Sequence, residues 1–317
     1  MYNEELKTKF VRWYTSSIYT AEVCKVIFSA FEKYENEWGA DLCTQSTQEL
    51  QPVVESLVGI RSKSKCIRLS ILKEYVKWCI AMKVPGACDG MLKIDVMGLD
   101  KIRQQTVASP LHLQMYLDSI CEPERAETTD NIYRCFYWLA YGGVSEEDIF
   151  GIKCSDVDLN DMVVRYDGGE VPIYREALAA FKNCVNLTQF VYKHPNYDKI
   201  VYMDRAVGDT LVRGIRSAPS VKAMRVALSR RSKENIDEGK TNLRLSYFRV
   251  WLSGLFYRTY ERERAGIPVN FSDAAAQFME GKTYKLDTGR NTPEAKKRKV
   301  AKEYLADYER WKLAFSI

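Results

Sequence analysis

The chain has 317 residues, 46% of them hydrophobic, which is enough for two domains with their own cores and too apolar for a disordered protein. The formal net charge of +5 is too small to identify a nucleic-acid-binding protein, so the distribution of the cations matters more. No apolar run is long enough to cross a bilayer, and the charged start MYNEELKTKF lacks the apolar stretch of a secretion signal. Nine scattered cysteines without C-x-x-C spacing predict reduced thiols and, with only two histidines, no zinc site.

Residues 1–83 are predicted to form a small all-helical domain. TAEVCKVIFSAFEKYENEW has helical periodicity, and STQELQPVVESLVG opens with a capping box of Ser46 and Glu49. A third helix, RSKSKCIRLSILKEYVKWCIAM, has an apolar stripe. The stripe consists of Ile67, Ile71, Tyr75 and Cys79.

Residues 84–108 are predicted to be a linker. VPGACDG breaks the helical pattern with Pro85 and Gly86, and periodicity stays weak until Ser109 and Pro110 start a new helix. A connection of this length would let two domains move apart and close again.

A second domain, residues 109–317, is predicted to be mostly helical with a small antiparallel sheet. The helix TTDNIYRCFYWLAYGG ends on two glycines, and Ser145 with Asp148 forms a box-like cap for a short helix. VDLNDMVVRYDGGEVPIY then alternates with a period of two, with turns at Asn160 and Gly168. The segments REALAAFKN, SVKAMRVALSRRSKE and LRLSYFRVWLSGLFYRTYERERAG return to helical periodicity.

Three stretches in this order resemble the tyrosine recombinases or phage integrases. LAYGGVSEEDIFGIKCSDVDL is similar to the family's first arginine box, LSYFRVWLSGLFYRTYERERAGI to its His-x-x-Arg box, and SKSKCIRLSILKEYVKWCI to a DNA-facing helix. The resemblance covers nearly the whole chain. It implies a mainly α fold, with a helical core-binding (SAM-like) domain followed by a mostly helical catalytic-type domain that contains a small antiparallel sheet.

The same resemblance implies a damaged catalytic site. In the family a tyrosine attacks a DNA phosphate, and two arginines with His or Lys stabilise the negative transition state. Here Ser145 occupies the first arginine position and Ser246 replaces the histidine, whereas Arg249 is kept and Lys282 falls near the third position. The hairpin turn RYDGGEVP offers only Arg165. We therefore expect a recombinase fold that has lost its catalysis.

The nucleophile has three candidates. Tyr284 lies at roughly the right distance beyond Arg249 but close behind FMEGK, and Tyr304 and Tyr308 lie in the last predicted helix. The alternative is that all three tyrosines pack against the fold or contact solvent.

Two basic clusters are predicted to contact DNA, with solvated helix faces as the alternative. The first comprises Arg61, Lys63, Lys65 and Arg68. The second comprises Lys222, Arg225, Arg230 and Arg231, followed by Arg244 and Arg249. Lys222, Arg225 and Ser229 share one helical face, which suits a helix along a phosphate backbone or in the major groove. Arg249 has the alternative of pairing with a carboxylate.

The last helix carries an amphipathic stripe. Its members are Val300, Tyr304, Tyr308, Trp311 and Phe315. The stripe is predicted to dock either on the chain's own catalytic-type domain or on a neighbouring subunit, which would make a homo-oligomer.

These patterns leave three hypotheses. The first is a double-stranded-DNA-binding protein from a prophage or mobile element that is catalytically inactive and acts as a regulator or accessory factor. The second is an active recombinase that uses Arg249, Lys282, Arg165 and one tyrosine. The third is a helical scaffold that binds only proteins. We expect a cytoplasmic, nucleoid-associated protein of a bacterial or phage-infected cell, with no cofactor, no metal and no membrane contact.

Overall fold

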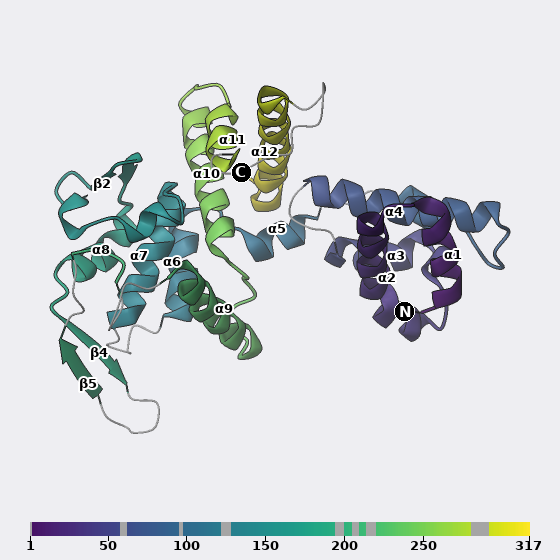
Figure 1. Ribbon diagram of the computed structural model, residues 1–317, viewed down its shortest axis with the longest axis horizontal. Coiled ribbons are helices and arrows are strands. Elements are labelled where there is room, and N and C mark those ends of the chain that lie inside the picture. Colours follow the sequence, from purple (N-terminus) through teal and green to yellow (C-terminus); the bar gives the residue numbers. More distant parts are fainter. Residues whose placement is uncertain are drawn as a thin grey trace. The chain divides into compact units, whose positions relative to one another are not determined.

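The computed structural model describes residues 2–57, 62–94, 98–121, 128–193, 200–204, 209–213, 220–279 and 292–317. Side chains are described throughout these ranges except at 62–66, 192–193, 200–204 and 278–279. The chain divides into two compact units. One consists of Met1–Ile102 with Ala275–Ile317, and the other of Arg103–Ala274. Figure 1 traces the helices and strands of both.

The first unit is built from helices. They are α1 (Glu4–Tyr14), α2 (Ile18–Trp38), α3 (Thr47–Leu57), α4 (Ser62–Ala81) and α12 (Pro293–Phe315), with most of α5 (Leu99–Gln105) and α11 (Ser272–Met279). Short 3-10 turns at Leu42–Thr44 and Gly90–Lys93 complete it. The predicted capping box opens α3, where Ser46 Oγ accepts from the Glu49 amide at 3.4 Å and Glu49 Oε2 accepts from the Ser46 amide at 3.0 Å.

An aromatic cluster forms the core of this unit. The Phe28 and Tyr75 rings lie 4.9 Å apart, and the Phe10 and Tyr75 rings 5.2 Å apart, both edge-on. All three side chains are fully buried. Because edge-on aromatic pairs add to the free energy of burial, this contact fixes how α1, α2 and α4 pack.

A buried ion cluster lies beside this core and consists of Lys7, Glu35, Asp41 and Tyr75. Lys7 Nζ donates to Glu35 Oε1 at 2.6 Å and lies 3.9 Å from Asp41 Oδ2, and the Tyr75 hydroxyl donates to the same Asp41 oxygen at 2.9 Å. Neither the Lys7 nor the Glu35 side chain has any exposed surface. Burial raises the pKa of Glu35, and the neighbouring ammonium group opposes that rise.

Residues 84–94, the first part of the predicted linker, pack on the N-terminal helices. The Cys88 amide donates to the Cys43 carbonyl at 2.9 Å, and Thr47 Oγ1 donates to the Gly90 carbonyl at 2.9 Å. A Cβ at Gly90 would lie 2.3 Å from the Gln45 carbonyl oxygen, so only glycine allows this approach. The functional domain limits 1–83, 84–108 and 109–317 stay a prediction. The boundaries of the compact units differ from them, because the first unit ends at Ile102 and the chain joins it again from Ala275.

The second unit combines helices with two small antiparallel sheets. Its helices are α6 (Pro110–Ile120), α7 (Thr128–Gly142), α8 (Leu178–Val185), α9 (Val221–Asp237) and α10 (Tyr247–Arg264). Its strands are β1 (Val157–Asp158), β2 (Val163–Tyr166), β3 (Gly169–Pro172), β4 (Gln189–Lys193) and β5 (Ile200–Asp204). Short 3-10 turns lie at Asp148–Phe150, Cys154–Asp156 and Arg175–Ala177.

Helix α7 is the centre of the second unit, and every residue from Cys135 to Gly142 is buried. Helix α10 crosses it closely at Gly254, where a Cβ would lie 1.9 Å from the Tyr141 carbonyl oxygen. The Trp251 indole donates to the Gly143 carbonyl at 3.2 Å. These contacts hold the loop after α7 against the first turns of α10, and both segments contribute to the candidate site.

The three-stranded sheet has the order β1-β2-β3, with Val164 opposite both Val157 and Val171. It forms in the segment where period-two alternation predicted it. The prediction of a mainly α fold with a small antiparallel sheet is therefore confirmed. The β4–β5 hairpin was not predicted, because its strands lie outside the clearly alternating stretch.

Candidate nucleic-acid interface

Helix α9 presents a basic face to solvent. It begins after Ser220, whose Oγ accepts from the Ala223 amide at 3.1 Å. Met224, Leu228 and Ser232 are buried at a spacing of four. The exposed side of the helix lies opposite them, as the helical period requires, and also carries Val226 and Glu234. We call its cations the α9 face. They are Lys222, Arg225, Arg230 and Lys233.

Arg225 is held in place by a carboxylate that the sequence analysis did not single out. Its Nε donates to Glu146 Oε1 at 2.7 Å, and its Nη2 donates to the second oxygen. The Arg225 side chain is 63% exposed, whereas that of Glu146 is only 5% exposed. The hydrogen bond to Glu146 raises the pKa of Arg225. The Arg225 side chain is therefore held in place, and the Glu146 carboxylate balances most of its positive charge. No local pattern marks a partner 79 residues away.

Two adjacent arginines of α9 have different surroundings. The Arg230 side chain is 72% exposed, and its Nε lies 3.7 Å from Glu234 Oε1. Arg231 is 15% exposed, pairs with Asp130 of α7, and lies 4.7 Å from the centre of the Tyr133 ring. Its guanidinium thus links α9 to α7 and leaves little surface for a phosphate. A DNA contact by Arg231 stays a prediction.

The segment before α10 and the first turn of that helix hold three more candidate residues. Ser246 caps the helix, because its Oγ accepts from the Arg249 amide at 3.4 Å. Arg249 is half-buried, and its carbonyl accepts from Ser253 Oγ at 2.7 Å. Arg244 is exposed and its amide donates to the Gln104 carbonyl at 2.8 Å. Where the resemblance would place a histidine, the side chain stabilises a helix start.

Ser145 accepts a hydrogen bond from the turn that follows it. Its Oγ accepts from the Asp148 amide at 3.1 Å, but the N-cap position of the 3-10 turn Asp148–Phe150 is Glu147, so Ser145 does not start an α-helix as predicted. The next residue is the buried carboxylate Glu146. This loop therefore presents a hydroxyl that accepts a backbone hydrogen bond and a buried carboxylate that pairs with Arg225.

Arg165 lies on the three-stranded sheet, surrounded by carboxylates. Its three nitrogens lie 2.9 Å from Asp158, 2.9 Å from Asp161 and 3.0 Å from Glu170. The backbone amide of Asp161 and the Arg165 guanidinium lower the pKa of Asp158. This cation is matched by three anions, so the hairpin adds no positive potential for a phosphate.

Two of the three candidate nucleophiles are buried, and the third lies outside the described residues. Tyr304 and Tyr308 of α12 have no exposed surface. Tyr308 stacks on Trp311 with ring centres 6.0 Å apart, and Lys312 Nζ lies 4.8 Å from the Tyr308 ring centre. Tyr284, like Lys282, lies outside the described residues. The C-terminal helix belongs to the first unit and contacts α4, an element that the sequence analysis did not consider for docking.

The N-terminal basic cluster is described only in part. Arg68 is half-buried and its Nη1 donates to the Leu57 carbonyl at the end of α3, a helix-terminating contact. Lys63 and Lys65 lie in α4 without described side chains, and Arg61 lies outside the described residues. A DNA contact by this cluster stays a prediction.

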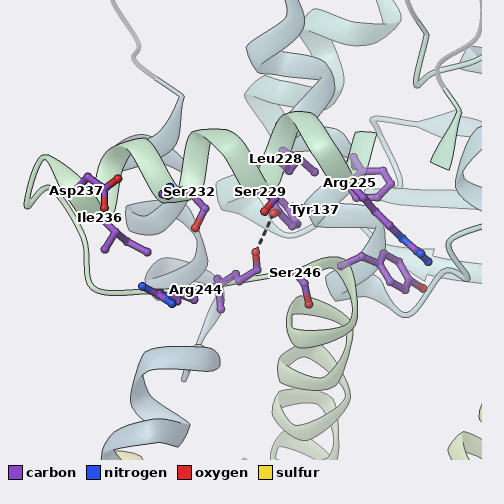
Figure 2. Close-up of a pocket in the computed structure, with 13 residues that line it drawn as sticks. Tyr137, Arg225, Leu228, Ser229, Ser232, Ile236, Asp237, Arg244 and Ser246 are labelled. Carbon is purple, nitrogen blue, oxygen red and sulfur yellow. Dashed lines mark hydrogen bonds between the residues drawn. The ribbon is translucent and has the colours of Figure 1, made fainter. Parts of the chain in front are cut away.

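A pocket of about 520 Å³ lies between α9, α7 and the segment before α10. Figure 2 shows Ser229, Ser232 and Ile236 of α9 on one side and Arg244 and Ser246 on the other. Tyr137 donates from its hydroxyl to the Leu245 carbonyl at 3.2 Å and so ties α7 to this segment. The pocket opens beside the cations of the α9 face.

Within the described ranges, no group of three or more His, Cys, Asp or Glu side chains is arranged to hold a metal ion. A search of the same ranges finds no helix with both the length and the hydropathy of a membrane span.

Comparison with known proteins gives a match over the N-terminal part. Residues 1–81 match the family model described as "MrpR, N-terminal core-binding domain". The predicted likeness to a core-binding domain is confirmed over these residues. No curated protein sequence matches the chain.

Solved structures that the chain is similar to are recombinases and integrases. A XerA recombinase is 14% identical, with 83% of this chain and 85% of that chain covered and a TM-score of 0.36. The Tn1549 transposon integrase in complex with circular intermediate DNA is 11% identical, with 93% and 98% covered and a TM-score of 0.36. A lambda integrase dimer bound to a COC′ core site is 11% identical, with 90% and 99% covered and a TM-score of 0.32.

Proposed function

We propose that this protein binds double-stranded DNA through the α9 face and Arg244, and that it does so without cutting the strand. The observation that carries the proposal is that three cations at this surface are exposed and unpaired within the described ranges. Lys222, Lys233 and Arg244 are exposed and have no ion-pair partner among the described residues. Cations without internal partners are available to phosphates.

A helix with this pattern suits a DNA backbone or major groove. An α-helix fits the major groove, and lysines and arginines on its outer side contact phosphate oxygens. Each phosphate that is neutralised releases counterions, which makes such binding strongly salt-dependent. The match of residues 1–81 to a core-binding domain supports a second contact from the N-terminal domain.

The absence of catalysis in this proposal follows from the charges around the matched positions. A phosphoryl-transfer site needs preorganised positive groups where negative charge develops, and removing one such donor costs roughly 10²–10³ in rate. The Ser145 and Ser246 hydroxyls accept backbone hydrogen bonds, Glu146 adds a buried carboxylate, and Arg165 is bound by three carboxylates. Arg249 is the one matched arginine in the described part of the chain.

The salt dependence of DNA binding tests the proposal. A gel-shift titration over a series of salt concentrations compares the wild type with the triple variant Lys222→Gln, Lys233→Gln, Arg244→Gln. Loss of three phosphate contacts would reduce the slope of log K against log salt by roughly 3, at about 0.9 for each contact.

A control variant removes the same charge elsewhere on the second unit. Lys153, Lys182 and Lys240 are exposed and lie outside the α9 face, so their triple Gln variant should keep a slope close to that of the wild type. Equal slopes for the wild type and the α9 variant would refute the proposed surface. Weak binding that does not depend on salt would favour the protein-only scaffold.

A nicked duplex tests for residual cleavage. A nick beside the target lets the cut end diffuse away, so an active tyrosine would stay covalently attached to DNA. We expect no covalent band on a denaturing gel. A band that is lost in Tyr284→Phe, Tyr304→Phe or Tyr308→Phe would show an active recombinase with a diverged site.

The biological part of the proposal is a regulator or accessory factor from a prophage or mobile element, associated with the nucleoid. Genes for phage or conjugative functions beside the coding gene would support that origin. Deleting the gene and measuring transcripts and excision of the surrounding element tests the role. Unchanged transcripts and unchanged excision would contradict it.

A further inference from the structure

The pocket beside the α9 face is larger than a backbone phosphate needs. Its volume of about 520 Å³ falls within the roughly 300–1,000 Å³ typical of small-molecule sites. A phosphate of an intact duplex would contact the cations at the mouth, because the bases remain stacked inside the helix. The interior therefore suits a ligand that has an uncharged part in addition to an anionic group.

The floor of the pocket is apolar and held in shape by hydrogen bonds. Leu228, Leu245, Ile236 and Tyr247 contribute to it. The Tyr247 hydroxyl donates to the Val144 carbonyl at 2.6 Å, and the ring packs 5.9 Å from that of Phe136. Because the floor is fixed by the fold, a flat ring can be received with little reorganisation.

The rim is polar and mostly basic. Lys233 and Arg244 line it from opposite sides, and neither has an ion-pair partner among the described residues. Ser229 and Ser246 add hydroxyl groups, and Asp237 adds one carboxylate at the end of α9. A ligand that matches this rim carries a negative group for the cations and hydrogen-bond donors for the carboxylate.

We propose that this pocket binds one nucleotide unit, with its base on the apolar floor and its phosphate between Lys233 and Arg244. The ring suits Tyr247 and Leu228, and the phosphate lies further along α9, on the side of Lys233 and Asp237. Two sources share this chemistry, namely a free 5′-nucleotide and a nucleotide rotated out of a bound strand. The strand-borne form rests on the proposed DNA binding, whereas the free form does not.

The first arm of the test uses free nucleotides. Calorimetric titration with each of the four deoxynucleoside 5′-monophosphates measures the affinity of the full chain and of Ser229→Trp, which fills the pocket from an exposed position on α9. Val226→Trp is the matched control, because Val226 is 62% exposed on the same helix and does not line the pocket. We expect Ser229→Trp to lose binding and Val226→Trp to keep it. Arg244→Gln should weaken binding about tenfold, and Arg230→Gln should not.

The second arm uses DNA with one unpaired, bulged nucleotide. A bulged base is already unstacked, so its entry into the pocket avoids the few kcal/mol that unstacking requires. A strand-borne ligand predicts tighter binding of the bulged duplex than of the perfect duplex, by about fivefold or more, and loss of that preference in Ser229→Trp.

The outcomes separate the two sources and the two proposals. If free nucleotides bind and Ser229→Trp abolishes that binding, the ligand is a free nucleotide. If only the preference for the bulged duplex is seen, the ligand is a nucleotide of the bound strand. If Ser229→Trp changes neither measurement, the pocket proposal is overturned. The wild type separates the two proposals. A steep salt slope for a perfect duplex, without nucleotide binding and without a preference for the bulge, would overturn the pocket proposal and leave the DNA-binding proposal standing.

Discussion

Lys7 and Lys233 carry the same charge in opposite surroundings. The Lys7 ammonium is sealed inside the first unit, between the Glu35 and Asp41 carboxylates. Lys233 lies in solvent on α9 and has no such partner among the described residues. A buried charge contributes to the fold only while its partners remain, whereas an exposed, unpaired charge contributes little to the fold and is available to a ligand. The comparison separates cations that stabilise the fold from cations to which we assign the proposed DNA contact.

Removing the buried ammonium should have the largest effect. Lys7→Met leaves Glu35 and Asp41 buried without their cation, which should lower the free energy of unfolding by roughly 3–5 kcal/mol. Urea denaturation followed by far-UV circular dichroism measures the change. Lys9→Met is the matched control, since Lys9 is 62% exposed and pairs only with Glu5 on the surface. If Lys7→Met and Lys9→Met unfold at the same urea concentration, the buried ion cluster has no structural role.

Arg230 and Arg231 allow the same comparison of a paired and an exposed cation within one helix. Arg231→Gln should destabilise the protein by roughly 2–3 kcal/mol, because the buried Asp130 carboxylate then loses its ion pair with this guanidinium. Arg230→Gln should change stability by less than about 0.5 kcal/mol and should instead weaken DNA binding. Thermal denaturation and a gel shift on the same two variants measure both quantities. The opposite pattern, with Arg230 essential to the fold and Arg231 to DNA binding, would reverse the assignment.

A helix cap should have a smaller effect. Ser46→Ala removes the side-chain acceptor for the Glu49 amide and the partner of the Glu49 carboxylate, which should cost about 1 kcal/mol. Thermal denaturation measures this loss. Ser56→Ala is a suitable control, since Ser56 donates to the Val53 carbonyl inside α3 and caps nothing. A loss in Ser56→Ala as large as that in Ser46→Ala would show that the capping box is not the cause.

The smallest expected effect is a dependence on pH. Burial lowers the pKa of His112 from its ordinary 6.5, so below that pH the unfolded chain binds more protons here than the folded chain. The stability that comes from neutral His112 is present above pH 6.5 and is lost as the pH falls through the lower folded pKa. Melting temperatures at about pH 7.5 and about pH 5.5 should therefore differ more in the wild type than in His112→Gln. An equal pH response in the two proteins would contradict this.

Local patterns predicted the starts of α3 and α6, but not α1 (Glu4–Tyr14) or α5 (Leu99–Gln105), which lies within the predicted linker. Ser109 accepts from the His112 amide at 3.2 Å and Ser46 from that of Glu49, as capping residues should. The spacing along α9 separated buried Met224 and Leu228 from the exposed cations. Caps and periodicity act over one or two turns, so the sequence contains them directly.

The partners of the charges could not be predicted in the same way. Glu146 pairs with Arg225 across 79 residues, and Asp130 with Arg231 across 101. Only the packing of α9 against α7 and the following loop brings these groups together. The basic helix was recognised as a candidate DNA contact, but which of its arginines are already occupied depends on the folded chain.

Hydrogen exchange in the presence of duplex DNA tests the central claim most directly. With the chain saturated by DNA at low salt, we predict slower exchange in peptides that cover residues 220–233 and 244–249, and unchanged exchange around Lys7 and Glu35. Protection that is absent from α9 and from the start of α10, while the DNA is bound, would contradict the claim that the exposed cations of α9 form the DNA-binding surface.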